Sequence, residues 1–291
     1  MTRTSISELL DREGPVVGPG IWDALSATLA ERAGFDMAFL SGFCMSAAPL
    51  AEPDFGLLTQ TEVLATAERV CAAVELPIIV DIDTGYGNAF NVERTVEALL
   101  RHGAAGCFLE DQVWPKRCGH MEEKRVVPLP EYLPKLRAAL EVCGGASFHV
   151  TARTDARAVH GLDEAIRRAK AFADAGADAV FVEAPRSIAE LERVAREVEG
   201  VTLVANMVEQ GKTPLCTPAE LHAMGFSLVA FPVSGMLAAA HAIERVFRTI
   251  ALDGTSAGCQ GEMRTFDGLN DLVGLAERYA REGAWRGGGP G

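Results

Sequence analysis

Residues 106–120 hold side chains whose types and spacing suit acid–base and metal chemistry. A short apolar run, Cys107-Phe108-Leu109, predicts a buried strand, and two carboxylates, Glu110 and Asp111, end it. Four further polar or reactive side chains then fall within five positions of the chain: Lys116, Arg117, Cys118 and His120. Carboxylates at the end of a buried strand can hold a hard metal ion through their oxygen atoms. The thiol of Cys118, placed among cations, is expected to have a depressed pKa and to move a proton near neutral pH.

Gly119 leaves the segment after this strand free to close over a substrate. Taken alone, the same residues also fit an ordinary strand end followed by a solvated basic loop, because charged residues are common after strands. The elements predicted around them distinguish these two interpretations.

Eight short apolar runs recur along the chain with Ala-rich amphipathic segments between them, which predicts alternating strands and helices. The predicted strands are residues 16–18, 37–40, 78–81, 106–109, 148–152, 179–183, 202–205 and 228–231. The predicted helices are residues 22–33, 59–74, 92–101, 130–141, 162–175, 188–197, 218–224 and 236–252. Eight strands that are each followed by a helix favour a parallel α/β fold, the closed (β/α)8 or TIM barrel, over an open sheet.

The regular alternation ends near Asp253. We therefore expect a barrel domain over residues 1–253, which would be the catalytic domain, and a C-terminal helical extension over residues 254–291. A last amphipathic segment covers residues 266–281, and the Gly- and Pro-rich residues 287–291 are expected to be disordered.

Active sites of (β/α)8 barrels lie at the carboxyl ends of the strands. The predicted strands end there in polar residues or glycine: Ser41, Gly42, Asp81, Asp83, Glu110, Arg153, Asp155, Glu183 and Asn206. Each one alone fits a solvated strand end, but so many on one edge favour a site. Asp81 and Asp83 share a face because alternate strand residues do, and two carboxylates held together there without a cation would be costly. With Glu110 opposite them, we predict Mg²⁺ or Mn²⁺ bound largely through water.

Two further groups at this edge are expected to bind a substrate. Arg153 offers a bidentate fork for a carboxylate, and Ser41-Gly42-Phe43 can present backbone N–H groups to an oxyanion. Other polar candidates are weaker. We expect Arg167-Arg168 to lie on a solvated helix face, and the lone histidines His149 and His160 to be structural.

The overall composition argues against several classes of partner. The formal net charge is -13 and the chain has no basic run, which argues against nucleic acid and anionic membrane surfaces. No apolar run approaches the roughly 20 residues that span a bilayer, and no signal-peptide core follows the polar N-terminus. The seven cysteines are odd in number and scattered, a pattern of reduced thiols that predicts a cytoplasmic protein.

Several motifs together resemble those of the isocitrate lyase and phosphoenolpyruvate mutase superfamily. Residues 80–88, Val-Asp-Ile-Asp-Thr-Gly-Tyr-Gly-Asn, resemble its metal motif. Residues 109–112 with residues 115–120, Pro-Lys-Arg-Cys-Gly-His, resemble the metal and gating-loop signature of its lyases. The set is completed by Ala152-Arg153-Thr154-Asp155-Ala156, Asn206-Met207-Val208-Glu209 and Lys212-Thr213-Pro214. The resemblance covers nearly the whole chain. It is strongest to the dimethylmalate lyases and the plant petal death protein, with carboxyphosphonoenolpyruvate mutase next.

The resemblance implies a role for each of these residues. The implied metal site consists of Asp83 as the most direct ligand, Asp81 and Glu110 holding metal-bound waters, and Asp54 supporting them. The implied substrate-binding residues are Ser41, Gly42, Phe43, Gly119, Glu183, Asn206 and Thr213. The implied catalytic residues are Lys116, Arg153, His120 and Cys118, with Cys118 as the proton donor on a mobile loop. Members of the superfamily are typically tetramers that exchange a C-terminal helix, so we expect a homotetramer.

The implied function is a metal-dependent carbon–carbon lyase. Its expected substrate is a 2-hydroxy dicarboxylate such as a 2-alkylmalate or 2,3-dimethylmalate, cleaved to an α-keto acid such as pyruvate plus a carboxylate. Methylisocitrate lyases carry an arginine where this sequence has Leu237, and a leucine cannot pair with an additional substrate carboxylate. The alternatives that stay open are an oxaloacetate hydrolase, a methylisocitrate lyase, a phosphonomutase and a non-catalytic binding protein.

Overall fold

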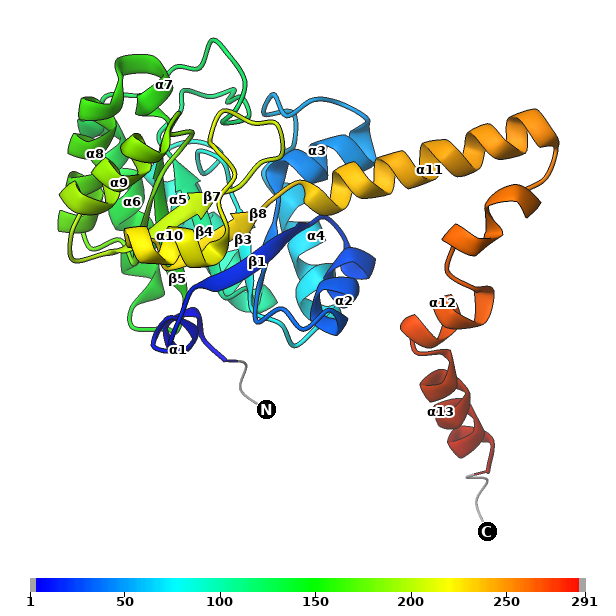
Figure 1. Cartoon of the computed structure of the whole chain (residues 1–291). Coiled ribbons are helices and arrows are strands. Elements are labelled where there is room, and N and C mark those ends of the chain that lie inside the picture. The colour runs from blue at the N-terminus through cyan, green and yellow to red at the C-terminus, as the bar shows by residue number, and fades with distance from the viewer. Residues whose placement is uncertain (1–3, 288–291) are drawn as a thin grey trace. The chain divides into compact units, whose positions relative to one another are not determined.

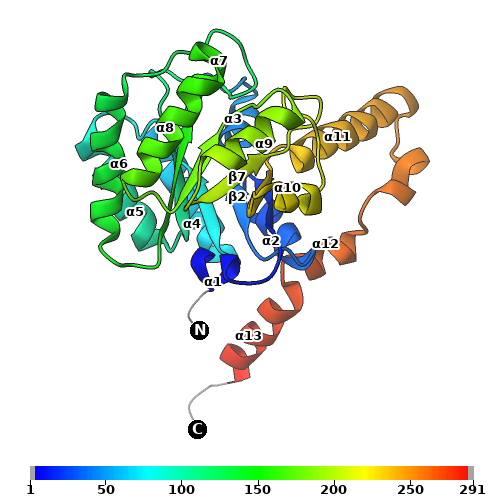
Figure 2. The same ribbon diagram turned by 60° about the vertical axis from the view of Figure 1, so that its left-hand side comes forward.

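The computed structural model describes residues 4–287, and its centre is a closed barrel of eight parallel strands (Figure 1). The strands are β1 (Val16–Ile21), β2 (Ala38–Leu40), β3 (Ile78–Asp81), β4 (Gly106–Glu110), β5 (His149–Thr154), β6 (Ala179–Val182), β7 (Thr202–Asn206) and β8 (Leu228–Phe231). Each strand pairs with the next one along the chain, and β8 closes the barrel against β1. The predicted parallel (β/α)8 barrel is therefore confirmed, and the helices surround the strands in both views (Figure 2).

Helices follow the strands as predicted, with three short additions. The helices up to residue 253 are α1 (Ile6–Leu10), α2 (Ala24–Arg32), α3 (Gly42–Leu50), α4 (Gln60–Ala73), α5 (Ala89–His102), α6 (Leu129–Cys143), α7 (Ala156–His160), α8 (Leu162–Asp174), α9 (Ile188–Glu197), α10 (Pro218–Met224) and α11 (Ser234–Asp253). The sequence prediction did not include α1, α3 or α7. Helix α3 consists of small and apolar residues, so its sequence has no polar face from which an amphipathic helix could be predicted. Its residues Cys44, Met45 and Ser46 are buried.

Two apolar layers result from the alternation of side chains along each strand. One set of strand residues packs outward against the helices, and the other fills the barrel interior. In the interior the ring of Phe108 lies 5.2 Å from that of Phe39 and 5.9 Å from that of Phe181. Ile6 and Leu9 of α1 belong to the same interior cluster. In both views α1 lies at the end of the barrel opposite to α7 (Figures 1 and 2).

The chain separates into two compact units, the first ending at Met236 and the second beginning at Leu237. The second unit contains most of α11, a 3-10 helix η1 (Ala257–Glu262), α12 (Phe266–Leu272) and α13 (Leu275–Gly287). The amphipathic segment predicted over residues 266–281 is thus two helices. Of the tail predicted to be disordered, residues 288–291 lie outside the described residues. The functional boundary expected at residue 253 stays a prediction.

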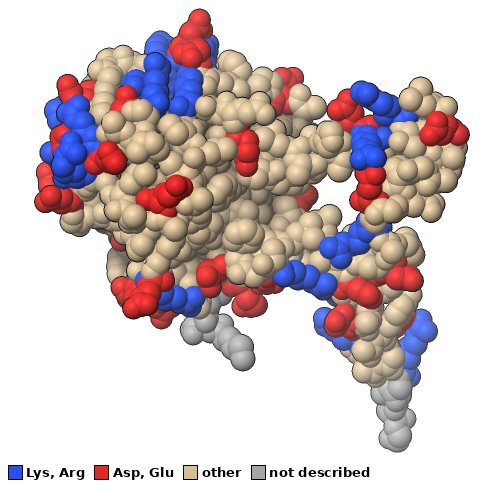
Figure 3. Space-filling model, viewed as in Figure 1, with Lys and Arg blue, Asp and Glu red and all other residues tan. Residues whose placement is uncertain are grey.

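Helices in the described part of the chain all fall short of the length and apolar character needed to cross a membrane. On the face drawn in Figure 3, Lys and Arg side chains lie beside Asp and Glu and form no continuous basic patch. All seven cysteines are free thiols.

Candidate active site

Side chains at the carboxyl ends of the strands point inward at alternate positions, as the apolar side chains of the barrel interior do. Phe108 and Glu110 are alternate residues of β4, and the pair Phe181 and Glu183 continues β6 in the same way. Arg153 lies opposite Glu110 in the register of β4 and β5. The side chains that follow the interior apolar residues therefore meet at the mouth of the barrel, as the strand alternation predicts.

Asp81 and Asp83 form one side of this mouth. The Asp83 N–H donates to Asp81 Oδ1 at 3.0 Å, and the Asp83 carbonyl accepts from the Glu110 N–H at 2.9 Å. Asp83 has a left-handed backbone with φ of 50°, and its side chain is buried. Burial raises the pKa of Asp83 to about 7, with the nearby Asp81 and Asp54 adding to the rise and the Lys116 charge opposing it.

Lys116 is buried among these carboxylates rather than solvated. Its Nζ lies 2.7 Å from Asp54 Oδ2 and 2.8 Å from Asp83 Oδ1. Because Lys116 is paired with these two carboxylates, the expectation of a depressed pKa for Cys118 has to be corrected. Burial raises the pKa of the Cys118 thiol to about 11, Asp54 adds to the rise, and the charge of Lys116 does not offset it. The predicted depressed pKa is wrong, and the thiol keeps its proton at neutral pH.

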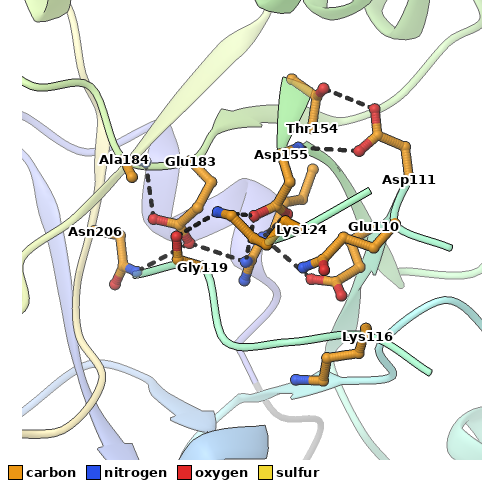
Figure 4. A network of polar contacts seen from close by, with 12 residues as sticks. Glu110, Asp111, Lys116, Gly119, Lys124, Thr154, Asp155, Glu183, Ala184 and Asn206 are labelled. Carbon is orange, nitrogen blue, oxygen red and sulfur yellow. Dashed lines mark hydrogen bonds and ion pairs between the residues drawn. The ribbon is translucent and has the colours of Figure 1, made fainter. Parts of the chain in front are cut away.

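Arg153 contacts three carboxylates. They belong to Glu110, Asp155 and Glu183, which are labelled in Figure 4. Arg153 Nε lies 2.9 Å from Asp155 Oδ2 and 3.2 Å from Glu110 Oε2, and its Nη2 lies 3.2 Å from Glu183 Oε2. Burial raises the pKa of Glu110 well above its ordinary value, although Arg153 opposes the rise. For Glu183 the balance is reversed: burial would raise its pKa, but the charge of Arg153 and the contact with the His120 ring lower it to about 2. Because protein carboxylates already contact Nε and Nη2, a substrate carboxylate would have to use Nη1.

The loop of residues 113–125 lies closed over these groups. The Cys118 N–H donates to the Asp54 carbonyl at 3.0 Å. The Lys212 N–H donates to His120 Nδ1 at 2.9 Å, so the ring proton is on Nε2, which lies 3.3 Å from Glu183 Oε1. A Cβ on Gly119 would lie 2.4 Å from Glu183 Cδ, so only glycine fits there without a shift. The predicted loop residues are thus brought onto the strand-end carboxylates.

The proposed oxyanion site at α3 is only partly free. Ser41 caps α3, and its own N–H donates to the Ile21 carbonyl at 3.0 Å. The Ser41 amide is therefore not available to an oxyanion, which corrects the prediction for this N–H group. The expected role of Ser41 in substrate binding stays a prediction. The N–H groups of Gly42 and Phe43 are in the first helical turn, where no intrahelical acceptor exists. Gly42 also lets α3 approach the metal motif, since a Cβ there would lie 2.7 Å from Asp81 Oδ2.

Asn206 and Thr213 complete the predicted set. Asn206 Nδ2 donates to Glu183 Oε2 at 3.3 Å, while its Oδ1 is buried with no hydrogen-bond partner. The buried hydroxyl of Thr213 likewise has no partner. Asn206 therefore lies on Glu183 at the site, and each of the two residues has a buried polar atom that is free to bind a ligand.

A hydrated divalent cation fits the carboxylates at this mouth. Among residues 4–287 no three acidic, histidine or cysteine side chains converge closely enough to hold an ion directly. However, both carboxylate oxygens of Glu110 and Oδ1 of Asp83 are buried without a directed hydrogen bond. Buried acceptor-only atoms of this kind suit a cation that keeps several of its waters.

Asp111 and Arg168 form a structural pair outside the site. Arg168 is buried, and its Nη1 donates to Asp111 Oδ2 at 2.9 Å, so the prediction of a solvated position is wrong for Arg168. Arg167 is exposed and pairs with Glu164 on its own helix. The two residues differ because α8 presents one side to the barrel and the other to water.

Comparison with known proteins shows the family of this chain. Residues 6–251 match the family model described as phosphoenolpyruvate phosphomutase. The chain belongs to the phosphoenolpyruvate mutase and isocitrate lyase superfamily. It is 46% identical over 285 residues to the petal death protein of Dianthus caryophyllus, covering 98% of this chain and 89% of the relative. It is 42% identical over 274 residues to the 2,3-dimethylmalate lyase of Eubacterium barkeri, covering 94% of each.

Solved structures of the superfamily share the whole fold. The structure of oxaloacetate acetylhydrolase in complex with 3,3-difluorooxalacetate matches with a TM-score of 0.92 and 33% identity, covering 99% of this chain and 97% of that one. Phosphonopyruvate hydrolase in complex with oxalate and Mg²⁺ matches with a TM-score of 0.83 and 29% identity, covering 92% and 93%. The protein is therefore an enzyme of this superfamily, in its group of carbon–carbon lyases and hydrolases.

Proposed function

We propose that the protein is a Mg²⁺- or Mn²⁺-dependent carbon–carbon lyase that cleaves a 2-alkylmalate or 2,3-dimethylmalate-like substrate to an α-keto acid such as pyruvate plus a carboxylate. The observation that carries the proposal is the closed loop of residues 113–125. It brings Cys118 to the backbone carbonyl of Asp54, next to the carboxylates of Asp54 and Asp83 that bind Lys116. The identity of 42% to a 2,3-dimethylmalate lyase supports the same substrate class.

The metal would be held by Asp83 and, through water, by Asp81 and Glu110. When bound, it supplies positive charge to the oxygen on C2 of the substrate as that oxygen develops negative charge. The N–H groups of Gly42 and Phe43, in the first turn of α3, would donate to the same oxygen. Arg153, oriented by its surrounding carboxylates, would hold the substrate carboxylate through Nη1.

Cys118 would complete the reaction by proton transfer. When the bond between C2 and C3 breaks, its electron pair remains on C3, the carbon that carries the carboxylate of the second product. That carbon takes the proton of the Cys118 thiol. The hydroxyl on C2 gives its proton to water as it becomes the keto group, and the Cys118 thiolate takes a proton back from water before the next turnover. A thiol whose pKa burial raises to about 11 holds its proton until the strongly basic carbanion forms. His120 and Lys116 would orient the loop on Glu183 and on the metal-binding carboxylates, respectively.

Leu237 supports a dicarboxylate rather than a tricarboxylate as substrate. It lies in the first turn of α11 and offers no charge to a third carboxylate. Since methylisocitrate lyases carry an arginine at the corresponding position, we expect methylisocitrate to be the poorer substrate.

A hydrolase that acts on oxaloacetate is the second candidate, because the TM-score of 0.92 to oxaloacetate acetylhydrolase is high. A substrate panel distinguishes the candidates. Purified protein with Mg²⁺ would be given 2,3-dimethylmalate, several 2-alkylmalates, methylisocitrate, oxaloacetate and phosphonopyruvate. We expect release of an α-keto acid from a dialkyl- or alkylmalate. Oxalate and acetate from oxaloacetate alone would assign the hydrolase, and turnover of phosphonopyruvate alone would assign phosphonate chemistry.

We further propose a homotetramer in which subunits exchange the C-terminal helices, located in the cytoplasm. Helix α11 has no buried residue, and large apolar side chains of the second unit are exposed: Phe247 by 67%, Leu252 by 78%, Phe266 by 80% and Trp285 by 71%. Apolar surface of this extent usually marks an interface. Light scattering on the full chain would test the tetramer, and a monomeric mass would contradict it. The seven free thiols fit a reducing compartment.

A further inference from the structure

We propose that Lys124 is a positioning residue that holds the loop of residues 113–125 closed and couples this closure to the orientation of Arg153. The proposal rests on the proposed function in one respect: it assumes that turnover requires the closed loop. The contacts themselves are independent of which substrate the enzyme uses.

Lys124 is the buried cation at the end of this loop. Its side chain is 1% exposed, whereas the neighbouring Arg125 is exposed. Lys124 Nζ donates to Asp155 Oδ1 at 2.6 Å and also to the carbonyl of Gly119 (Figure 4). One ammonium group thus joins the tip of the loop to the end of β5. We call this arrangement the Lys124 bridge.

The barrel side of the Lys124 bridge is rigid. The Asp155 N–H donates to Asp111 Oδ1 at 2.9 Å, and Thr154 Oγ1 donates to Asp111 Oδ2 at 2.7 Å. Arg168 Nη1 also donates to Asp111 Oδ2, at 2.9 Å. Asp155 therefore offers a fixed anchor against which the loop can close.

Asp155 is shared between the loop and Arg153. Its Oδ2 accepts from Arg153 Nε at 2.9 Å while its Oδ1 accepts from Lys124. Within this group Arg153 alone would face three buried carboxylates, and Lys124 adds the second positive charge. Because buried anions without enough positive charge are unfavourable, the group favours the closed position of Lys124. Opening of the loop would take the Lys124 charge away from Asp155, the carboxylate nearest to Arg153 Nε. The orientation of Arg153 would therefore depend on loop closure.

Closure by the Lys124 bridge also brings the reactive part of the loop into place. Gly119, whose carbonyl Lys124 holds, lies directly on Glu183. His120 follows and faces Glu183 through Nε2, and Cys118 precedes. The Lys124 bridge thus fixes the loop at the one residue between the proposed acid Cys118 and the proposed orienting residue His120.

The test compares Lys124→Met with Arg125→Met, which removes a positive charge at the adjacent exposed position. The readout is cleavage after Arg117 by an arginine-specific protease, followed by mass spectrometry with and without oxalate and Mg²⁺. A charge-assisted hydrogen bond of this kind shifts an opening equilibrium by about 10- to 100-fold. We expect Lys124→Met to be cut faster by that factor and to lose protection by oxalate. The Arg125→Met variant should be cut after Arg117 at the wild-type rate.

Kinetics provide the second arm on the same variants. Lys124→Met should lower kcat by about 10- to 100-fold with a smaller change in KM. A cleavage rate equal to that of wild type would overturn the proposal, and so would a lower melting temperature with unchanged oxalate protection. If wild type cleaves no alkylmalate, the proposed function fails while the protease comparison still tests the Lys124 bridge.

Wild-type protein gives a test that does not depend on the folding of a variant. Brief acetylation with acetic anhydride should modify Lys124 at least about tenfold more slowly than the exposed Lys170, and oxalate with Mg²⁺ should slow it further. Equal modification of the two lysines would show that the Lys124 bridge does not hold the loop closed in solution.

Discussion

Replacing Gly119 by alanine is the sharpest steric test of the closed site. The backbone of Gly119 lies outside the left-handed region, so alanine causes no backbone strain there. Its Cβ would lie 2.4 Å from Glu183 Cδ and 2.5 Å from Cγ, whereas ordinary contacts begin at 3.4 Å. The loop or Glu183 must therefore shift by about 1 Å, since 3.4 minus 2.4 is 1.0.

Glu183 cannot absorb this shift easily, because the Ala184 N–H donates to its Oε1 at 2.9 Å and Arg153 contacts its Oε2. A misplacement of about 1 Å at a reacting group typically costs about 10²-fold in rate, which corresponds to about 2.7 kcal/mol of barrier. We expect Gly119→Ala to lower kcat/KM by about that factor and to leave the melting temperature within a few degrees of wild type.

The assay couples α-keto acid release from the best alkylmalate to a dehydrogenase. Gly261→Ala is the matched control, because a Cβ there meets nothing within 4 Å and its backbone is also outside the left-handed region. The control should keep wild-type kinetics. If Gly119→Ala also kept wild-type kcat/KM, the closed loop described here would not be the form that turns over.

Four further outcomes follow from the site. Cys118→Ser should bind Mg²⁺ and oxalate normally but lose about 10² to 10⁴ in turnover, and near-wild-type turnover would remove Cys118 from the mechanism. Asp83→Asn, which tolerates the φ of 50°, should weaken Mg²⁺ binding in calorimetry and abolish turnover with unchanged circular dichroism; activity in EDTA would refute the metal site. Leu237→Arg should move kcat/KM from alkylmalate toward methylisocitrate, a prediction that fails if wild type already prefers methylisocitrate. Burial lowers the pKa of His149 from 6.5 to about 4, so the unfolded chain binds the proton first and stability falls as the pH decreases through that range. His149→Gln should remove this acid sensitivity, worth at most about 1.4 kcal/mol for each unit of the pKa difference, and urea unfolding at several pH values measures it.

The strands and the long helices follow from local patterns in the sequence. Each strand is a short apolar run, and each long helix has an amphipathic period, so the eight-stranded barrel could be predicted from the chain alone. Helix α3 could not, because its run of small and apolar residues has no alternation of polar and apolar faces, although Ala48, Pro49 and Leu50 are exposed. The strand-end residues Asp81, Glu110 and Arg153 could also be placed together, since parallel strands in a barrel end at one edge.

The ionisation of the site depends on tertiary structure. In the sequence, Cys118 stands among Lys116, Arg117 and His120, which suggests a depressed pKa. In the structure, Lys116 is bound by Asp54 and Asp83, which are distant in the chain, and burial raises the pKa of the thiol. A pKa reports the balance of desolvation and charge in three dimensions, and neighbours in the chain do not determine it.

Lys124 shows the same limit for the loop. In the sequence it follows two glutamates and precedes an arginine, the pattern of an exposed polar loop. Only the closed loop places its Nζ against Asp155 and the Gly119 carbonyl. The residue types and their order along the chain therefore determined the barrel and the edge at which the candidate site lies. Which charges are buried, and which partner each one has, was decided by the packing of a loop across strand ends that lie far from it in sequence, because burial and pairing energies depend on distance in space.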